Sequence, residues 1–147
     1  MYALLFSVLS FASEYEILGH WRKDPRVIYC KDSGVSLDHV KDAMEYWQKK
    51  GFNTGELTIK DACDINYQYS YIKIVKPSTV NGDIHYAHTD MQISSNRIDY
   101  AVIQVSSEGS RYYETILHEM GHALGIDHVS DSSDIMYRYH LDSWTNL

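Results

Sequence analysis

Basic residues and long apolar segments are both scarce in this chain of 147 residues. It has 13 Lys and Arg against 20 Asp and Glu, which gives a net charge of −7. Because nucleic acids and anionic membrane surfaces attract positive charge, this balance argues against either as the main partner. No segment reaches the about 20 apolar residues that a membrane-spanning helix needs, so no membrane span is expected. The length suits one domain with a sizeable core, and we expect a monomer.

Only two cysteines are present, Cys30 and Cys63. A disulfide between them would close a loop of about thirty residues and stabilise the domain by about 3–4 kcal/mol in the chain-entropy model. The alternative is two reduced thiols buried in the core, where cysteine behaves as a small apolar residue. The choice depends on whether the protein is exported to an oxidising compartment, so both alternatives stay open.

The apolar segment over residues 2–12 is too short to cross a bilayer but has the length of a signal-peptide core. Its last residues, serine, phenylalanine and alanine, form an acceptable cleavage site, although no Lys or Arg precedes the segment. Residues 1–12 are therefore predicted to be the signal peptide of a secreted protein. The alternative is a hydrophobic N-terminal segment packed on the domain of a cytoplasmic or particle-associated protein. We expect the folded domain to occupy residues 21–147, beginning near Trp21.

Three histidines lie at spacings that suit a metal site near the end of the chain. His118 and His122 are four residues apart, which on an α-helix places them on one face, roughly 6 Å apart along the axis. Gly125 is where this helix should end, because glycine adopts the left-handed conformation without steric cost. The chain can then fold back and bring His128 to the same metal. Three neutral imidazoles leave the fourth tetrahedral position open, which is typical of catalytic zinc.

Two acidic residues, each next to one of the histidines in the sequence, bear on this interpretation. Glu119 follows the first histidine, where its carboxylate can reach a water on the metal and act as a general base. Asp127 could compete with His128 as the third ligand, although catalytic zinc favours neutral imidazole. The two histidines four residues apart are a weak signal by themselves, since any amphipathic helix can carry two solvated histidines by chance.

The pattern His-Glu-x-x-His-x-x-Gly-x-x-His begins at His118 and ends at His128, and Met136 and Tyr137 follow it. This combination resembles the metzincin signature, a zinc site followed by a methionine turn. It is most similar to the matrixin branch, including its bacterial and phage-type minimal catalytic domains. The resemblance implies a zinc metalloendopeptidase with one catalytic zinc on the three histidines and Glu119 as general base. It also implies that Met136 forms a hydrophobic floor beneath the zinc and that Tyr137 has a structural role beside it.

Two functions are compatible with such a site. The first is an active endopeptidase that hydrolyses peptide bonds of extended polypeptides through a zinc-activated water and the Glu119 base. The alternative is a catalytically inactive binding or structural module of the same fold that still contains zinc. The presence of Glu119 favours the enzyme, because a structural zinc site needs no general base.

The predicted fold class is α+β: a metzincin-like (zincin) domain with a twisted mixed sheet of four or five strands, an N-terminal helix, an active-site helix and a truncated C-terminal helix. Alternating β-branched residues and turn signals predict the strands, and apolar residues at helical spacing predict the helices. The predicted strands cover residues 26–30, 56–60, 70–75, 84–88 and 98–105, one helix follows Ser36 and ends by Gly51, one runs from Ser107 or Ser110 through Leu124, and a short C-terminal stub lies around residues 141–144.

The predicted strand from Ile84 to His88 should form an open edge of the sheet, by its order along the chains of the family that the sequence resembles. An extended substrate would then pair with it as an additional antiparallel strand. His85 and His88, with Asp90 nearby, also invite a second metal. Residues three apart on a strand point to opposite faces, so we expect no second structural metal.

Overall fold

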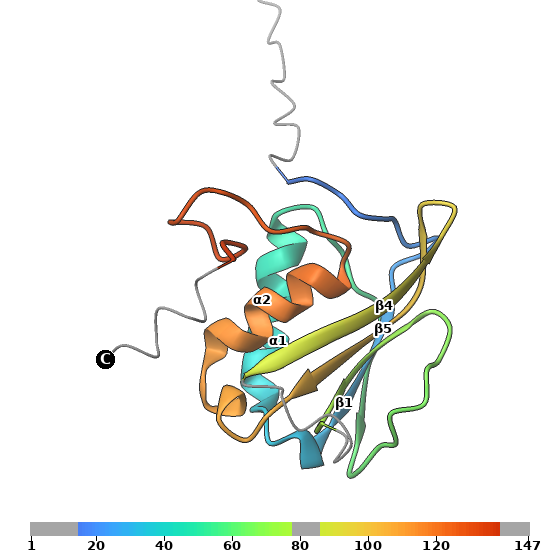
Figure 1. The fold of residues 1–147 in the computed structure, drawn as a ribbon. Helices are drawn as coiled ribbons and strands as arrows, with labels where there is room; N and C mark the ends of the chain where they lie inside the picture. The colour runs from blue at the N-terminus through green and yellow to red at the C-terminus, as the bar shows by residue number, and fades with distance from the viewer. Residues whose placement is uncertain (1–14, 78–85, 139–147) are drawn as a thin grey trace, which may run out of the picture.

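The computed structural model describes residues 15–77 and 86–138, in which two helices lie on one side of a five-stranded sheet (Figure 1). This arrangement confirms the predicted α+β class and the mixed sheet. No helix in these residues is both long and apolar enough to span a membrane. The predicted signal peptide, the first residues of the predicted 84–88 strand and the predicted stub at 141–144 lie outside the described residues. The strands are β1 (Arg26–Cys30), β2 (Leu57–Lys60), β3 (Tyr71–Val75), β4 (Ala87–Ser94) and β5 (Arg97–Val105), and the helices are α1 (Leu37–Lys49) and α2 (Tyr113–Ala123), with short 3₁₀ helices at Lys31–Ser33 and Gly109–Arg111.

In the described chain the strands are ordered β2-β1-β3-β5-β4. The first four strands in this order run parallel, whereas β4 pairs antiparallel with β5. Most residues of β1 and β3 are buried, as expected for parallel strands that are covered on both faces. β4 is therefore an edge strand, and it contacts α2, the helix that carries two of the candidate metal ligands.

The strand predicted over residues 84–88 overlaps β4 at residues 87 and 88, and its first two residues lie outside the described part of the chain. β4 starts at Ala87 and continues to Ser94, through residues that we expected to be a polar interval. A two-residue turn at Ser95 and Asn96, with φ values of 51° and 62°, returns the chain into β5. Paired positive φ values match the right-handed twist of a hairpin. The predicted polar interval after residue 88 was wrong, because an edge strand keeps polar side chains on its exposed face and no glycine marks the turn.

The helix α1 forms as predicted after Ser36 and ends before Gly51, which has a φ of 92°. Its buried face includes Val40 and Trp47. The indole Nε1 of Trp47 donates a 2.8 Å hydrogen bond to the carbonyl oxygen of Leu117 on α2. This contact joins the two helices inside the core, so α1 helps to set the position of α2.

The helix α2 begins later than predicted, because neither Ser107 nor Ser110 is its N-cap. The chain first makes the 3₁₀ turn, and Tyr112 then precedes the helix. The hydroxyl of Ser110 donates instead to the carbonyl oxygen of Ser107, at 2.8 Å. A Cβ on Gly109 would lie 2.1 Å from the carbonyl oxygen of Tyr86, so the turn is pressed against the chain before β4. This tertiary contact decides where the helix starts.

The N-terminal segment before Trp21 is already part of the fold, although we expected the folded part to begin near that residue. The amide of Leu18 donates to the carbonyl oxygen of Gly125 at 2.7 Å. Ile17 and Ile126 form an isolated antiparallel bridge. The segment therefore runs beside the loop that follows α2, where it can support the third histidine.

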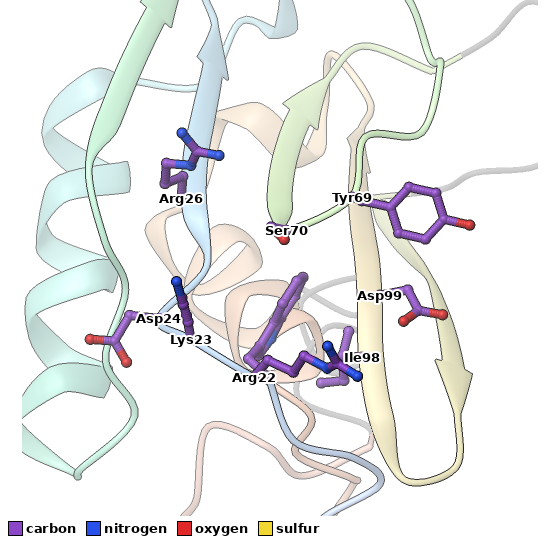
Figure 2. Close-up of a pocket in the computed structure, with 9 residues that line it drawn as sticks. Arg22, Lys23, Asp24, Arg26, Tyr69, Ser70, Ile98 and Asp99 are labelled. Atoms are coloured by element: carbon purple, nitrogen blue, oxygen red, sulfur yellow. The ribbon is translucent and has the colours of Figure 1, made fainter.

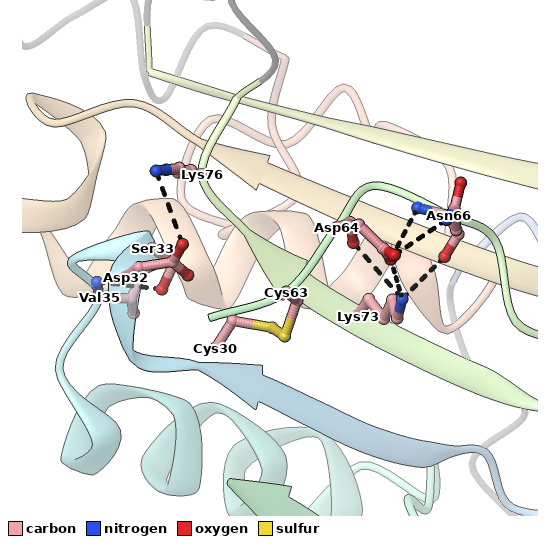
Figure 3. The surroundings of a disulfide bond; sticks show 9 residues. All are labelled: Cys30, Asp32, Ser33, Val35, Cys63, Asp64, Asn66, Lys73 and Lys76. Carbon is pink, nitrogen blue, oxygen red and sulfur yellow. Dashed lines mark hydrogen bonds and ion pairs between the residues drawn. A yellow bond between two sulfur atoms is a disulfide. The ribbon is translucent and has the colours of Figure 1, made fainter. Parts of the chain in front are cut away.

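The segment between β2 and β3 covers the face of the sheet opposite the helices (Figure 3). Cys30 and Cys63 form a disulfide there, with a Cα–Cα distance of 5.8 Å, so the structure selects one of the two alternatives left open by the sequence. Lys73, only 6% exposed, donates to the carbonyl oxygen of Asn66 at 2.8 Å and pairs with Asp64 at 3.3 Å. The hydrogen bond from Lys73 lowers the pKa of Asp64. These contacts fasten the segment to the sheet.

We expect replacement of Cys30 and Cys63 by alanine to lower the free energy of unfolding by about 3–4 kcal/mol, because the disulfide closes a loop with a sequence separation of 33. Denaturant unfolding of the wild-type protein and the double variant measures this loss. Treatment of the wild-type protein with a thiol reductant should lower its free energy of unfolding by a similar amount. Such a result would show that the stability comes from the cross-link and not from the two sulfur atoms themselves. Equal stability of the oxidised and reduced proteins would contradict the prediction.

Candidate metal centre

Three histidine rings meet at the C-terminal end of α2. His118 and His122 belong to the helix, and His128 lies in the loop that follows it. One ligand nitrogen from each ring lies within 4.8 Å of the other two. In the described parts of the chain, this is the one group of three or more His, Cys, Asp or Glu side chains close enough to share a metal ion. The fold therefore brings together the three histidines that the sequence singled out.

Backbone carbonyl groups orient two of the three rings. Nδ1 of His118 lies 2.7 Å from the carbonyl oxygen of Ile135, and Nδ1 of His122 lies 2.8 Å from that of Ile126. A carbonyl oxygen only accepts hydrogen bonds, so in each neutral ring Nδ1 carries the proton and Nε2 keeps a lone pair. A backbone partner on the second ring nitrogen is typical of metal-binding histidines.

The donor set fits a tetrahedral zinc ion. The Nε2 atoms of His122 and His128 are 3.1 Å apart, close to the separation of about 3.3 Å that two nitrogen ligands about 2.05 Å from zinc would have. Burial lowers the pKa of both rings, and Arg138 lowers that of His128 further. The neutral imidazole that binds metal is therefore favoured. A set of three imidazoles leaves one coordination position for water or substrate.

The loop to His128 depends on a left-handed turn at Gly125, whose φ is 97°. The amide of Gly125 donates to the carbonyl oxygen of His122 at 2.8 Å, which closes the end of the helix. A Cβ at this position would lie 2.3 Å from the carbonyl oxygen of Gly19. Glycine is therefore required both for its conformation and for the close approach of the N-terminal segment.

The carboxylate of Asp127, the alternative third ligand in the sequence, contacts the backbone of the next residue. Its Oδ1 accepts a 2.7 Å hydrogen bond from the amide of His128. The amide of Asp127 itself donates to the carbonyl oxygen of Glu16 at 3.0 Å. The group of convergent ligand atoms contains His128 and leaves Asp127 out. Asp127 thus supports the loop that presents the third histidine.

A methionine turn follows this loop, and the side chain of its methionine, Met136, is fully buried. Met136 packs against α2, where a Cβ on Gly121 would lie 2.4 Å from the methionine sulfur. The amide of Met136 donates to Oδ1 of Asp134 at 2.8 Å. Val129 and Tyr137 form an isolated parallel bridge. Met136 therefore contributes an apolar layer against the helix, and Tyr137 joins the turn to the histidine loop.

Sequence reasoning missed one side chain that supports the site. Oη of Tyr15 donates a 2.8 Å hydrogen bond to Oδ2 of Asp134, the carboxylate that also holds the methionine turn. The tyrosine ring packs edge-on against Trp47, with ring centroids 5.7 Å apart. Tyr15 and Asp134 are 119 residues apart in the sequence, and no local pattern connects them. The contact is visible only in the folded chain.

Glu119, the predicted general base, lies on α2 beside His118 and is 5% exposed. Burial raises the pKa of its carboxyl group to about 7, although the hydrogen bond from Thr89 opposes this rise. The hydroxyl of Thr89, on β4, donates to Oε2 of Glu119. A buried carboxylate with raised proton affinity, next to His118 in the helix, suits a general base.

His88 and Asp90, two of the residues that invited a second metal, contact each other, with Nε2 and Oδ1 3.0 Å apart. Asp90 also accepts a 3.0 Å hydrogen bond from Gln104 on the neighbouring strand. No third metal-binding side chain joins this pair within the part of the chain that the structure describes, and His85 lies outside that part. The expectation that no second metal binds stays a prediction.

A separate pocket of about 640 Å³ lies where β1, β3 and β5 begin (Figure 2). Its lining contains neither the three histidines nor the glutamate of the metal group. Positive and negative side chains both line it, so charge does not select a class of ligand. The charged residues are Arg22, Lys23, Asp24, Arg26 and Asp99.

The methionine turn packed against the helix of the histidine group distinguishes this fold from other zinc peptidases and makes the protein a metzincin. Within that class, a sequence profile of the matrixin family matches residues 35–145. The chain therefore belongs to the matrixin family, which is zinc-dependent. The predicted resemblance to matrixins is confirmed.

Two known proteins are similar to parts of this chain. A segment of 63 residues, 42% of the chain, is 35% identical to the "Putative matrix metalloproteinase" of Spodoptera frugiperda ascovirus 1a and covers 16% of that protein. The crystal structure of metalloproteinase-II from Bacteroides fragilis matches with 21% identity and a TM-score of 0.43, over 86% of this chain and 48% of the other. The matched region spans less than half the length of either protein.

Gly51 and Gly125 offer a matched test of the turn before His128, because both follow a helix with a positive φ, 92° and 97°. In Gly51→Ala the new Cβ meets no atom within 4 Å, so we expect a loss of about 1–2 kcal/mol in unfolding free energy from the conformation alone. Gly125→Ala also drives Cβ into the carbonyl oxygen of Gly19, which should cost about 1–3 kcal/mol more and weaken zinc binding. Denaturant unfolding and zinc titration measure both effects. Equal losses in the two variants would show that the close approach is unimportant.

Proposed function

We propose that this protein is a zinc-dependent endopeptidase that cleaves extended polypeptides. The observation that carries this proposal is the position of Glu119, a buried residue of α2 that directly follows the first of three convergent histidines. A purely structural zinc site has a closed ligand set and needs no base. Membership of the matrixin family supports the same conclusion.

Zinc held by His118, His122 and His128 would polarise the scissile carbonyl group and acidify a water molecule. The three rings direct ligand nitrogens toward one point, and backbone carbonyl groups keep two of them in the required tautomer. Glu119 accepts a proton from the attacking water and then passes it to the leaving nitrogen. Met136 is fully buried against Gly121 of α2 and excludes bulk water from that part of the helix, which strengthens electrostatic interactions nearby.

We place the substrate along the outer edge of β4, the described strand that overlaps the edge strand predicted over residues 84–88. This proposal is supported by the order of the sheet, because β4 is its last strand in the described chain and has a partner strand on one side only. An extended peptide can pair with such an edge, with main-chain hydrogen bonds for affinity and alternate side chains for specificity. Thr89 of this strand contacts Glu119, so a peptide paired here would pass the base.

We also propose that the protein works in an oxidising compartment outside the cytosol. The Cys30–Cys63 disulfide supports this, since such bonds persist in secreted proteins and are rare in reducing compartments. The proposal agrees with the signal peptide predicted over residues 1–12. Because both cysteines belong to this bond, neither is a free thiol that could bind zinc.

Glu119→Gln should strongly reduce peptide cleavage without removing zinc, because the amide keeps the shape of the carboxylate but cannot accept the proton. We expect elemental analysis to find one zinc per chain in both proteins, and cleavage of a peptide library to fall by about 10²–10⁴-fold in the variant. Glu114→Gln is the matched control. It removes a carboxylate from the first turn of the same helix and should retain activity.

Three other results would each change the conclusion. Zinc in both proteins with cleavage by neither would favour the alternative, an inactive binding or structural module that contains zinc. Absence of zinc from both would exclude His118, His122 and His128 as its ligands. Equal cleavage by both would exclude Glu119 as the base.

A further inference from the structure

β4 turns one polar side chain toward the helices. Ala87 and Met91 pack against the apolar core, and Thr89 lies between them in the same alternating row. His88 and Asp90 alternate with this row and contact each other. An apolar residue would suit the position of Thr89 if packing alone decided it. The hydroxyl group therefore calls for a further explanation.

The hydroxyl of Thr89 meets the carboxylate of Glu119. Its Oγ1 donates to Oε2 and lies 3.3 Å from the backbone oxygen of the same residue. Thr89 pairs with Ile103 of β5, so the sheet holds it independently of α2. Within residues 15–77 and 86–138, no other side chain donates a hydrogen bond to this carboxylate. Oε2 is thus engaged by Thr89, whereas Oε1 has no protein donor in those residues.

We propose that Thr89 is a positioning residue, which fixes the rotation of the Glu119 carboxylate so that Oε1 accepts the proton of the attacking water. This inference rests on the proposed endopeptidase function. The last torsion of a glutamate side chain is broad and roughly two-fold, so the helix alone does not decide which oxygen faces the site. A hydroxyl group has one proton to donate, and its bond to Oε2 removes this freedom.

The place of Thr89 also links the base to the proposed substrate strand. The backbone of β4 would align the peptide, and a side chain of the same strand holds the base. The scissile bond and Glu119 therefore keep a constant relative position when a peptide pairs with β4. A misplacement of about 1 Å in such an arrangement can reduce the rate roughly 100-fold.

Thr89→Val tests this role, because it removes the hydroxyl group and keeps the β-branched shape. In the full zinc-loaded chain we expect kcat to fall roughly 10- to 100-fold, with KM changed by less than about threefold. Thr89→Ser restores the donor and should recover most of the lost kcat. Zinc content should be equal in the wild-type protein and both variants.

Thr115→Val is the matched control, because Thr115 is a buried threonine of α2 whose Oγ1 has no hydrogen-bond partner among the described residues. Its kcat should stay within about twofold of the wild-type value, since no hydrogen bond is lost. Wild-type kcat in Thr89→Val would overturn the positioning role. So would an equal loss in Thr115→Val, or a failure of Thr89→Ser to recover activity.

The ¹³C resonance of the Glu119 side-chain carboxyl group, assigned with Glu119→Gln, separates this inference from the function on which it rests. Loss of the hydrogen bond should shift the resonance in Thr89→Val and leave it unchanged in Thr115→Val, whether or not the protein cleaves peptides. If Thr89→Val shifts the resonance but the wild-type protein cleaves no peptide, the endopeptidase proposal is overturned and, with it, the catalytic role of the contact. Cleavage by the wild type with no shift in Thr89→Val would overturn the role of Thr89 alone.

Discussion

Three imidazole rings can share one metal ion only if the fold holds a nitrogen atom of each ring close to the other two. The Nε2 atoms of His122 and His128 are only 3.1 Å apart. Backbone oxygens of Ile135 and Ile126 keep two rings from turning away. The left-handed turn at Gly125 brings the third ring back to the helix. Every other feature of the site depends on this convergence.

Elements from both ends of the chain maintain this arrangement. Trp47 of α1 donates to the backbone of α2 through Leu117, which sets the helix that carries two ligands. Tyr15 reaches Asp134 and thereby holds the methionine turn. A metal ion bound to the assembled histidines would stabilise the folded state in return, because the unfolded chain offers no such site.

The ligands come from a helix and its loop, whereas the proposed base is also held by the sheet. Thr89 makes this connection from β4, and the disulfide-linked segment covers the other face of the sheet. An open edge strand usually exposes a protein to unwanted pairing with other chains. Here β4, an edge strand within the described residues, contacts Glu119 through Thr89, so in our proposal the backbone groups of this edge bind the substrate.

The sequence by itself determined the features whose geometry is local. Helical rise brings His118 and His122 to one face, and the left-handed preference of glycine ends the helix at Gly125. Tertiary structure decided the rest. The extent of β4 follows from its pairing with β5, and the contact between Thr89 and Glu119 joins residues 30 positions apart. Such contacts leave no periodic signature, because they depend on how separate elements pack and not on which residues are neighbours in the chain.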